Sequence, residues 1–310
     1  VEVRVAGDNA LSIAIAPPDD DGGANITHYM YKIRNNMCKN HSCLAYYPFD
    51  GDVQDKSGNA NHATLEGDAI FVNSEIGQRQ ALNFPGTASY VVLPTNVWLA
   101  DRNSWTFLAF IKCDVDGGII YMESAGSFYK NGFAINYVRT GEARKYFWFD
   151  NYNPAGGPTI TGTKDPDTLQ DIGSTYHHLA IVRDSTKIKW YLDGIYYGYE
   201  NYETYSSGVP TRTTLGGRAG THFTGSMDEV YILSDALSAN QVEAFYQSVS
   251  WHPCTYMTGS NLLLIKAHVF RAAINPVSVD VYSCNLFGCS TDFATDATTV
   301  PHKPKSVEVR

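Results

Sequence analysis

The stretch Gly225-Ser-Met-Asp228-Glu-Val-Tyr-Ile-Leu-Ser-Asp-Ala-Leu237 decides the fold, because it predicts a closing strand that runs directly into a short helix. Residues 238–248 are the best helix candidate in the chain, and Ser238 and Gln241 have the spacing of a capping box. An apolar stripe for this helix is supplied by Leu237, Val242, Phe245 and Tyr246. The stretch therefore predicts a β-strand followed by one isolated helix.

Elsewhere the chain alternates apolar and polar residues with a period of two, as half-buried strands do. The alternation is clear at residues 1–5, 11–15, 29–33 and 277–281, and turn-forming clusters such as residues 17–23 separate the runs. Tyrosine (21) and phenylalanine (14) are abundant while charged residues make up only 18%, a composition typical of β-sheets. We expect an all-β protein with one short helix.

The composition also excludes several classes of partner. The 310 residues carry a net charge of −9, which argues against binding to nucleic acid or to anionic membrane surfaces. No apolar run reaches the roughly 18–20 residues that span a bilayer. The opening Val-Glu-Val-Arg-Val lacks the layout of a signal peptide, so we expect a mature or excised segment.

Cysteines and glycosylation sequons predict an extracellular protein. Cys38 and Cys43, and likewise Cys284 and Cys289, are separated by four residues, a spacing that suits a bridge across a turn. Two further cysteines, Cys113 and Cys254, make the set even, as expected of a disulfide-bonded secreted protein. The sequons place candidate glycosylation sites at Asn25 and Asn40.

Both ends of the chain resemble a fibronectin type III domain. Residues 11–29, with the turn Pro17-Pro18-Asp19-Asp20-Asp21-Gly22-Gly23, follow that family's strand B and its entry into strand C, although Ile15 stands where the family usually has tryptophan. Residues 281–288 stand where strand F and its turn belong. Because each half lacks strands that the other supplies, we expect one sandwich, residues 1–43 and 250–300, split by an insertion.

The insertion, residues 44–249, resembles a laminin-G-like (concanavalin A-like) jelly roll. The resemblance rests on Tyr47-Pro-Phe-Asp50-Gly51, Ala81-Leu-Asn-Phe84, Ser104-Trp105-Thr-Phe107, residues 176–194 and the closing stretch 225–237. It implies an all-β sandwich of two sheets and carries little information on function, since the fold serves lectins, adhesion modules, spacers and hydrolases. With this arrangement, Cys284–Cys289 would bridge the F–G hairpin. The nearest remaining pairing is Cys38–Cys43, but a bridge from Cys254 to either border cysteine would clamp the neck of the insertion, and Cys113 lies inside it.

The sequence offers no catalytic constellation, so we expect a protein that is not an enzyme. The motifs H-E-x-x-H, G-x-S-x-G and the E-x-D-x-E strand of concanavalin-like glycosidases are missing. The pair His177-His178 lies on an expected strand, where neighbours point to opposite faces and do not easily share one metal ion.

Calcium is the one inorganic ligand that the sequence suggests. Asp50, Asp55 and Asn59 lie on the opening loop of the insertion and Asp228 in its closing strand, regions that hold a structural Ca²⁺ in many relatives. The alternative is that these aspartates make hydrogen bonds within turns.

A tyrosine cluster is the candidate contact surface. It comprises Tyr196, Tyr197, Tyr199, Tyr202 and Tyr205. Three interpretations stay open: a platform for sugars, a surface for protein contacts, or alternate tyrosines that belong to the core.

The sequence Val1-Glu-Val-Arg4 recurs as Val307-Glu-Val-Arg310, after a proline-containing stretch. Residues 301–310 are therefore expected to be a linker and the start of a next repeat, in a tandem array. The leading hypothesis is a structural repeat unit of an extracellular fibre or surface appendage, whose partners are neighbouring copies. The alternative is an adhesin that binds carbohydrate or matrix protein.

Overall fold

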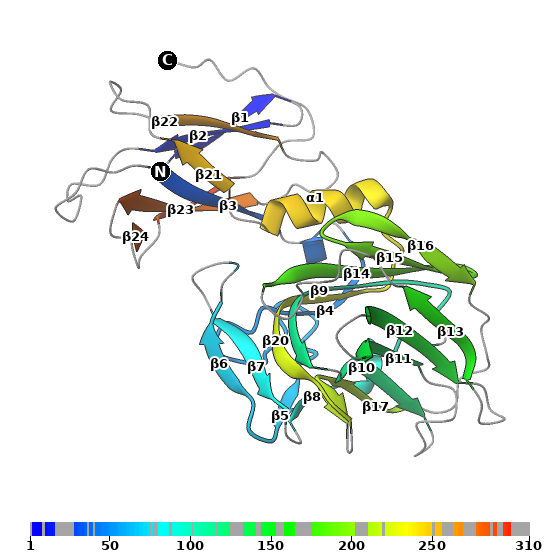
Figure 1. Ribbon diagram of the computed structural model, residues 1–310. Helices are drawn as coiled ribbons and strands as arrows, with labels where there is room; N and C mark the ends of the chain where they lie inside the picture. The colour runs from blue at the N-terminus through cyan, green and yellow to red at the C-terminus, as the bar shows by residue number, and fades with distance from the viewer. Residues whose placement is uncertain are drawn as a thin grey trace. The chain divides into compact units, whose positions relative to one another are not determined.

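The chain divides into two compact units. In the computed structural model, unit 1 comprises residues 1–40, 76–78 and 240–310, and unit 2 comprises residues 41–75 and 79–239 (Figure 1). The structure describes residues 2–7, 10–15, 28–35, 37–39, 41–74, 76, 80–86, 89–100, 102–115, 117–124, 133–140, 144–152, 158–164, 175–201, 210–218, 221–249, 252–255, 263–268, 277–285, 288–289 and 294–298.

Unit 1 contains two antiparallel sheets built from both ends of the chain. One has the order β1-β2-β22, with β1 Glu2–Gly7, β2 Ala10–Ile15 and β22 Leu263–His268. The other has the order β21-β3-β23-β24, with β25 also paired to β23. Its strands are β3 His28–Asn35, β21 His252–Thr255, β23 Val277–Asn285, β24 Gly288–Cys289 and β25 Ala294–Thr298. The N-terminal strands therefore pair with strands more than 200 residues away in the sequence.

Two of the short helices among the described residues lie largely in unit 1. The 3₁₀ helix η1 covers Met37–Lys39 and the α-helix α1 covers Ala239–Val249. The predicted helix at residues 238–248 is thus confirmed to within one residue at each end. Val242 and Phe245 of its apolar stripe are buried.

Unit 2 is a sandwich of two antiparallel sheets. The first has the order β16-β15-β14-β9-β20-β7-β6, and β4 pairs with the end of β20 that β7 leaves open. Its strands are β4 Cys43–Tyr47, β6 Ile70–Asn73, β7 Gln80–Pro85, β9 Ser104–Val115, β14 His177–Asp184, β15 Lys187–Leu192, β16 Ile195–Asn201 and β20 Thr224–Leu233. Residues 225–233 of the predicted closing strand form most of β20, which lies beside the central strand β9 of this sheet.

The second sheet of unit 2 has the order β13-β12-β11-β10-β17-β8-β5. Its strands are β5 Thr64–Glu66, β8 Tyr90–Leu93, β10 Gly117–Ser124, β11 Phe133–Thr140, β12 Arg144–Tyr152, β13 Pro158–Lys164 and β17 Pro210–Leu215. A short hairpin of β18 Gly217–Arg218 and β19 Thr221–His222 follows β17, and the 3₁₀ helix η2 covers Thr95–Val97. Gly216 thus precedes this β-hairpin and Gly217 opens it.

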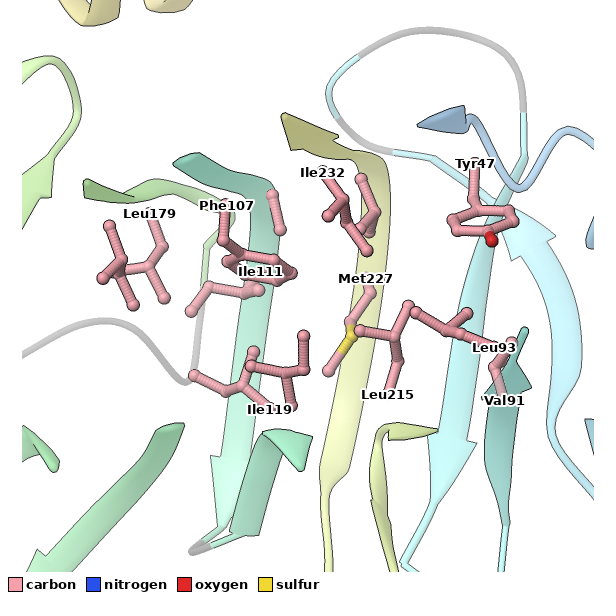
Figure 2. Packing of buried hydrophobic residues seen from close by; sticks show 14 of the residues in the cluster. Tyr47, Val91, Leu93, Phe107, Ile111, Ile119, Leu179, Leu215, Met227 and Ile232 are labelled. Atoms are coloured by element: carbon pink, nitrogen blue, oxygen red, sulfur yellow. The ribbon is translucent and has the colours of Figure 1, made fainter. Parts of the chain in front are cut away.

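The core of unit 2 lies between the two sheets (Figure 2). Every second residue of β9 points into it, and Trp105, Phe107 and Ile111 are completely buried. The intervening residues Leu108 and Phe110 are buried as well. A strand buried on both faces reads as a nearly continuous apolar run, which explains the sequence Trp-Thr-Phe-Leu-Ala-Phe-Ile.

Cys113 belongs to the same inward-facing row of β9. It is 1% exposed and is a thiol in the core, so the expectation that it takes part in a disulfide is wrong. The physical reason is the pleat of the strand, which directs residue 113 towards the same apolar side chains as Phe107 and Ile111.

Gly225 lets β20 approach β9 closely. Its φ is +140°, and a β-carbon there would lie 1.9 Å from the backbone oxygen of Lys112. The register between β20 and β9 shifts at this point, a β-bulge that increases local twist. No residue other than glycine fits the position.

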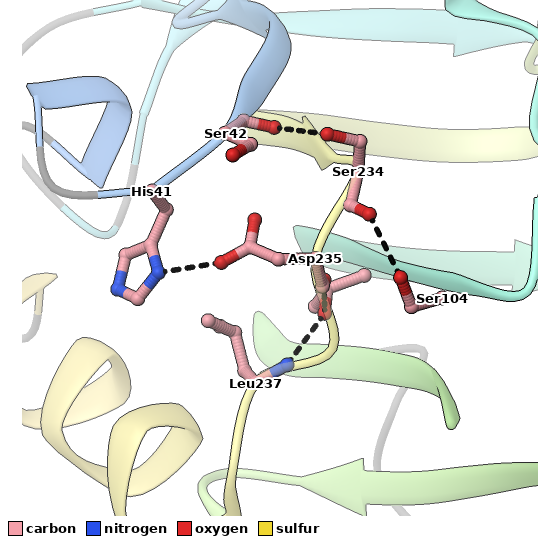
Figure 3. A network of polar contacts seen from close by, with 7 residues as sticks. His41, Ser42, Ser104, Ser234, Asp235 and Leu237 are labelled. Atoms are coloured by element: carbon pink, nitrogen blue, oxygen red, sulfur yellow. Dashed lines mark hydrogen bonds and ion pairs between the residues drawn. The ribbon is translucent and has the colours of Figure 1, made fainter. Parts of the chain in front are cut away.

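The segments that enter and leave unit 2 lie side by side (Figure 3). The backbone N–H of Ser234 donates to the carbonyl of Ser42 at 2.8 Å, and the Ser234 hydroxyl donates to the same carbonyl at 3.0 Å. His41 Nδ1 lies 2.8 Å from Asp235 Oδ2. Thr106 holds the segment that leaves unit 2. Its hydroxyl donates to the carbonyl of Asp235 and accepts from the backbone N–H of Leu237.

Candidate functional site

The candidate site is the side of β15 and β16 that faces away from the core, at the edge of the first sheet. Ile188, Trp190 and Leu192 of β15 point into the core, so the residues between them point outwards. We call the outward set the tyrosine face; it consists of Lys187, Lys189, Tyr191, Tyr196 and Tyr199.

A β-bulge places two exposed tyrosines on this face. Tyr191 pairs with Tyr196, whereas Trp190 pairs with Gly198, so Tyr197 is the extra residue of β16. Residues three apart on a regular strand point to opposite faces, but the bulge brings Tyr196 and Tyr199 to the same one. Their exposed fractions are 48% and 46%, so both rings are open to a ligand.

Each exposed ring is held by a neighbour on β15. The Tyr196 ring centroid lies 5.4 Å from that of Tyr191, with the ring planes tilted by 56°. Lys187 Nζ lies 4.2 Å from the centroid of the Tyr199 ring, a cation–π contact. Burial raises the pKa of Tyr191, which therefore stays neutral at ordinary pH.

The second lysine of the face is held by an ion pair. Lys189 Nζ donates to Asp184 Oδ2 at 2.7 Å, and this hydrogen bond is the largest of the effects that raise the pKa of Lys189. The tyrosine face thus presents aromatic rings, a fixed ion pair and the ammonium of Lys187. Such a surface can stack on an apolar ring face and donate hydrogen bonds at its margin.

The remaining predicted tyrosines divide into two groups. Tyr197 is half-buried and packs against the core, as the core interpretation requires. Tyr202 and Tyr205 lie outside the described residues. Sequence reasoning missed Lys187 and Tyr191, because their roles depend on the register between β15 and β16.

Asp55, a predicted calcium ligand, anchors the opening loop of unit 2 through its carboxylate. Oδ1 accepts from the backbone N–H groups of Tyr46 at 3.0 Å and Ser57 at 2.8 Å. Oδ2 accepts from the Ser57 hydroxyl at 2.8 Å and the backbone N–H of Asn61 at 2.9 Å. Burial acts to raise the pKa of Asp55, but these hydrogen bonds outweigh it and lower the pKa below its ordinary value.

The other predicted calcium ligands also accept or donate protein hydrogen bonds. Asp50 Oδ1 accepts from the backbone N–H of Gln80 at 3.2 Å. Asn59 Nδ2 donates to the carbonyl of Cys43 at 2.7 Å, so its amide acts as a donor here. Asp228 Oδ2 accepts from the Ser74 hydroxyl at 2.5 Å, and its Oδ1 accepts from the backbone N–H of Glu229 at 2.8 Å.

These hydrogen bonds do not test the calcium prediction. Within the described part of the chain, no group of three or more His, Cys, Asp or Glu side chains is arranged to hold a metal ion. Both carboxylate oxygens of Asp55 accept hydrogen bonds from N–H or O–H groups, whereas a Ca²⁺ ion needs six to eight oxygen ligands. Calcium binding stays a prediction for a chelation experiment.

The two adjacent histidines face opposite sides of β14, which confirms their expected orientation. His177 Nδ1 lies 2.7 Å from Asp193 Oδ2, and its Nε2 lies 3.1 Å from the Thr175 hydroxyl. His178 is completely buried beside Phe110, and burial lowers its pKa to about 3, so the ring is neutral. The pair holds the β15–β16 turn and the sheet in place.

Cys38 and Cys43 are both disulfide-bonded. The pairing register places Cys284 opposite Cys289 across the β23–β24 hairpin, as the predicted bridge requires of the backbone. The side chains of Cys254, Cys284 and Cys289 lie outside the described residues, and so do the candidate glycosylation residues Asn25 and Asn40. No helix among the described residues is long and apolar enough to cross a membrane.

Solved structures show the same fold at low sequence identity. Domain 4 of AbnA, an extracellular arabinanase from Geobacillus stearothermophilus solved in complex with arabinotriose, matches with a TM-score of 0.52 and 19% identity, over 67% of this chain and 99% of that domain. A structure of botulinum neurotoxin type C, whose cell entry depends on two ganglioside molecules, matches with a TM-score of 0.53 and 12% identity, over 69% of this chain and 52% of the other. The binding domain of Paraclostridial Mosquitocidal Protein 1 matches with a TM-score of 0.51 and 10% identity, over 80% and 76%.

The chain thus spans about half the length of the botulinum neurotoxin chain that it matches. No curated protein matches the sequence significantly. The family model for the concanavalin A-like lectin/glucanases superfamily matches residues 85–243, which cover most of unit 2 and the start of α1 and make up just over half of the chain. The chain therefore belongs to the concanavalin A-like lectin/glucanase superfamily.

Proposed function

We propose that the protein is a carbohydrate-binding module and that the tyrosine face is its binding surface. The observation that carries the proposal is the exposure of Tyr196 and Tyr199 on one side of an edge strand, at 48% and 46%. Large aromatic rings are normally buried at least in part, and two on one face favour a ligand that stacks on them. The C–H face of a sugar ring is such a ligand.

The organisation of the face supports this function. The bulge at Tyr197 sets the two rings on one side, and bulges commonly re-aim side chains next to functional sites. Tyr191 and Lys187 brace the rings, which lowers the conformational entropy that a ligand must overcome. Carbohydrate ligands named for two of the matched structures are consistent with the proposal.

The proposed activity is binding without catalysis. The described carboxylates with the greatest burial, Asp55, Asp228 and Glu229, each accept hydrogen bonds that fix loops and strands of unit 2. We propose an extracellular location, which the disulfide-bonded Cys38 and Cys43 favour.

Glycan binding by the intact 310-residue chain tests the proposal. We expect binding to a panel of immobilised oligosaccharides that includes arabinotriose, and a loss of about tenfold in affinity for Tyr196→Ala and for Tyr199→Ala. Tyr90→Ala is the matched control. The Tyr90 ring also makes a cation–π contact, with Arg212 Cζ 4.6 Å from its centroid, but Tyr90 lies on β8 of the other sheet, away from the tyrosine face. Equal affinity of all three variants and the parent chain would contradict the assignment of the surface.

A second function, a repeat unit of a fibre, is favoured by the recurrence of Val1-Glu-Val-Arg4 at residues 307–310. We propose that unit 1 is a fibronectin type III-like sandwich, which its three-stranded and five-stranded sheets support. Electron micrographs of the natural gene product test the repeat: regularly spaced knobs along a filament support it, and a compact monomer contradicts it.

A further inference from the structure

The tyrosine face carries two lysines with different partners. Lys187 and Lys189 are two residues apart on β15 and therefore point to the same side. The ammonium of Lys189 is neutralised by Asp184 at 2.7 Å. The ammonium of Lys187 rests on the Tyr199 ring instead, 4.2 Å from its centroid.

From this difference, and resting on the proposed carbohydrate site, we infer that the ligand is an acidic saccharide chain whose carboxylate or sulfate groups bind Lys187. An aromatic ring orients an ammonium without cancelling its charge, whereas a carboxylate cancels it. Lys187 is thus a positioned donor that is ready for an anion, and Lys189 is a structural lysine.

The two exposed rings and the ammonium of Lys187 lie within reach of one short saccharide chain. Tyr196 lies opposite Tyr191, and Tyr199 lies opposite Lys189, two residues away along β15. Two residues of strand extend about 7 Å, and the ammonium of Lys187 rests on the Tyr199 ring. A saccharide chain that stacks on both rings therefore brings an acidic group of the sugar at Tyr199 close to Lys187.

The charge of the surroundings makes this recognition selective. The chain as a whole carries −9, so a polyanion is repelled from most of its surface. Among the described charged side chains of β15, β16 and their margin, Asp184 pairs with Lys189 and Asp193 lies 2.7 Å from His177, while Glu200 lies on β16. An acidic polymer is therefore held through a local contact with Lys187 and not by a positive field of the whole face, and the attraction weakens as salt is added.

Titration calorimetry with the intact chain and three size-matched probes tests the inference: polygalacturonate oligomers for carboxylates, sulfated dextran oligomers for sulfates, and neutral arabino-oligosaccharides. We expect tighter binding of at least one acidic probe, weakened by salt. Lys187→Gln should lower that affinity about fivefold to tenfold, and should lower the affinity for the neutral probe less, by about twofold, because the neutral probe loses only the brace of the Tyr199 ring. The double variant Lys189→Gln with Asp184→Asn is the matched control and should change the acidic affinity by less than about twofold, because it removes the ion pair without changing the net charge.

The outcomes separate this inference from the proposed function. Binding of the neutral probe alone, or equal losses for Lys187→Gln and the double variant, overturns the acidic specificity and leaves the carbohydrate site standing. Binding of acidic probes that is unaffected by Tyr196→Ala but abolished by salt assigns the effect to charge alone and overturns both. A lack of binding to any of the probes also overturns both.

Discussion

Removal of the Asp55 carboxylate is the sharpest test of how the opening loop of unit 2 is held. Asp55 is 6% exposed and accepts hydrogen bonds from three backbone N–H groups and one hydroxyl. Asp55→Ala leaves the three N–H groups of Tyr46, Ser57 and Asn61 without their acceptor. At about 1 kcal/mol for each lost partner, the free energy of unfolding should fall by about 3 kcal/mol.

Asp55→Asn should cost less, about 1–2 kcal/mol. The amide oxygen can still accept the two hydrogen bonds that Oδ1 accepts in the parent chain. The amide nitrogen is itself a donor, however, so the backbone N–H of Asn61 loses its acceptor. Asp52→Asn is the control, since the Asp52 side chain is 44% exposed and pairs with Lys56 at the surface. It should change stability by less than about 0.5 kcal/mol.

Chemical denaturation followed by tryptophan fluorescence measures these differences. The pKa of Asp55 is lowered in the folded state, so its contribution is fully present above its unfolded pKa of about 3.9 and is lost as pH falls through the folded value. The gap between the parent chain and Asp55→Asn should therefore narrow in acid. A loss below 1 kcal/mol for Asp55→Ala, or a chelator that destabilises the parent chain as much as the substitution does, would refute the hydrogen-bond explanation and favour calcium.

Three further predictions concern stability and are checked by the same denaturation experiment. Gly225→Ala should prevent folding or destabilise by more than about 3 kcal/mol because its β-carbon would meet backbone, whereas Gly58→Ala, with nothing within 4 Å, should cost only the strain of a positive φ, about 1–2 kcal/mol. Phe107→Ala should cost about 3–5 kcal/mol through the cavity it leaves, and a value below 2 kcal/mol would contradict the tight packing of the core. Asp235→Asn should cost no more than about 1 kcal/mol, because the Asp235 side chain is 37% exposed. Burial acts to raise the pKa of Asp235, but the hydrogen bond to His41 is foremost among the effects that lower it below its ordinary value. The difference in stability between the parent chain and Asp235→Asn should therefore vanish as pH falls through this lowered pKa.

The sequence predicts the elements whose pattern is local. The closing strand, the helix after it and the opposite orientations of His177 and His178 all follow from periodicity and capping residues within one segment. The doubly buried β9 is also visible as an apolar run. These features depend on neighbours in the chain, which a single sequence contains.

The candidate site depends on contacts between segments and was only partly predictable. Period-two alternation would put Tyr196 and Tyr199 on opposite faces, and the bulge that reverses this is a property of the pairing between β15 and β16. Asp55 is ambiguous for a different reason, since an aspartate in a loop has the same sequence signature as a metal ligand and as an anchor of backbone N–H groups. An even number of cysteines suggested a partner for Cys113, but the pleat of β9 directs it into the core.

The hydrogen bonds between Ser42 and Ser234 have a consequence for how such a protein can arise. A domain whose first and last strands finish beside each other can be spliced into a surface loop of a host as a cassette, since the host needs to open only by the width of two adjoining strands. The same closure allows the cassette to be exchanged for another of equal neck width without redesign of the host. Grafting residues 41–239 into a loop of an unrelated carrier would thus transplant the tyrosine face intact.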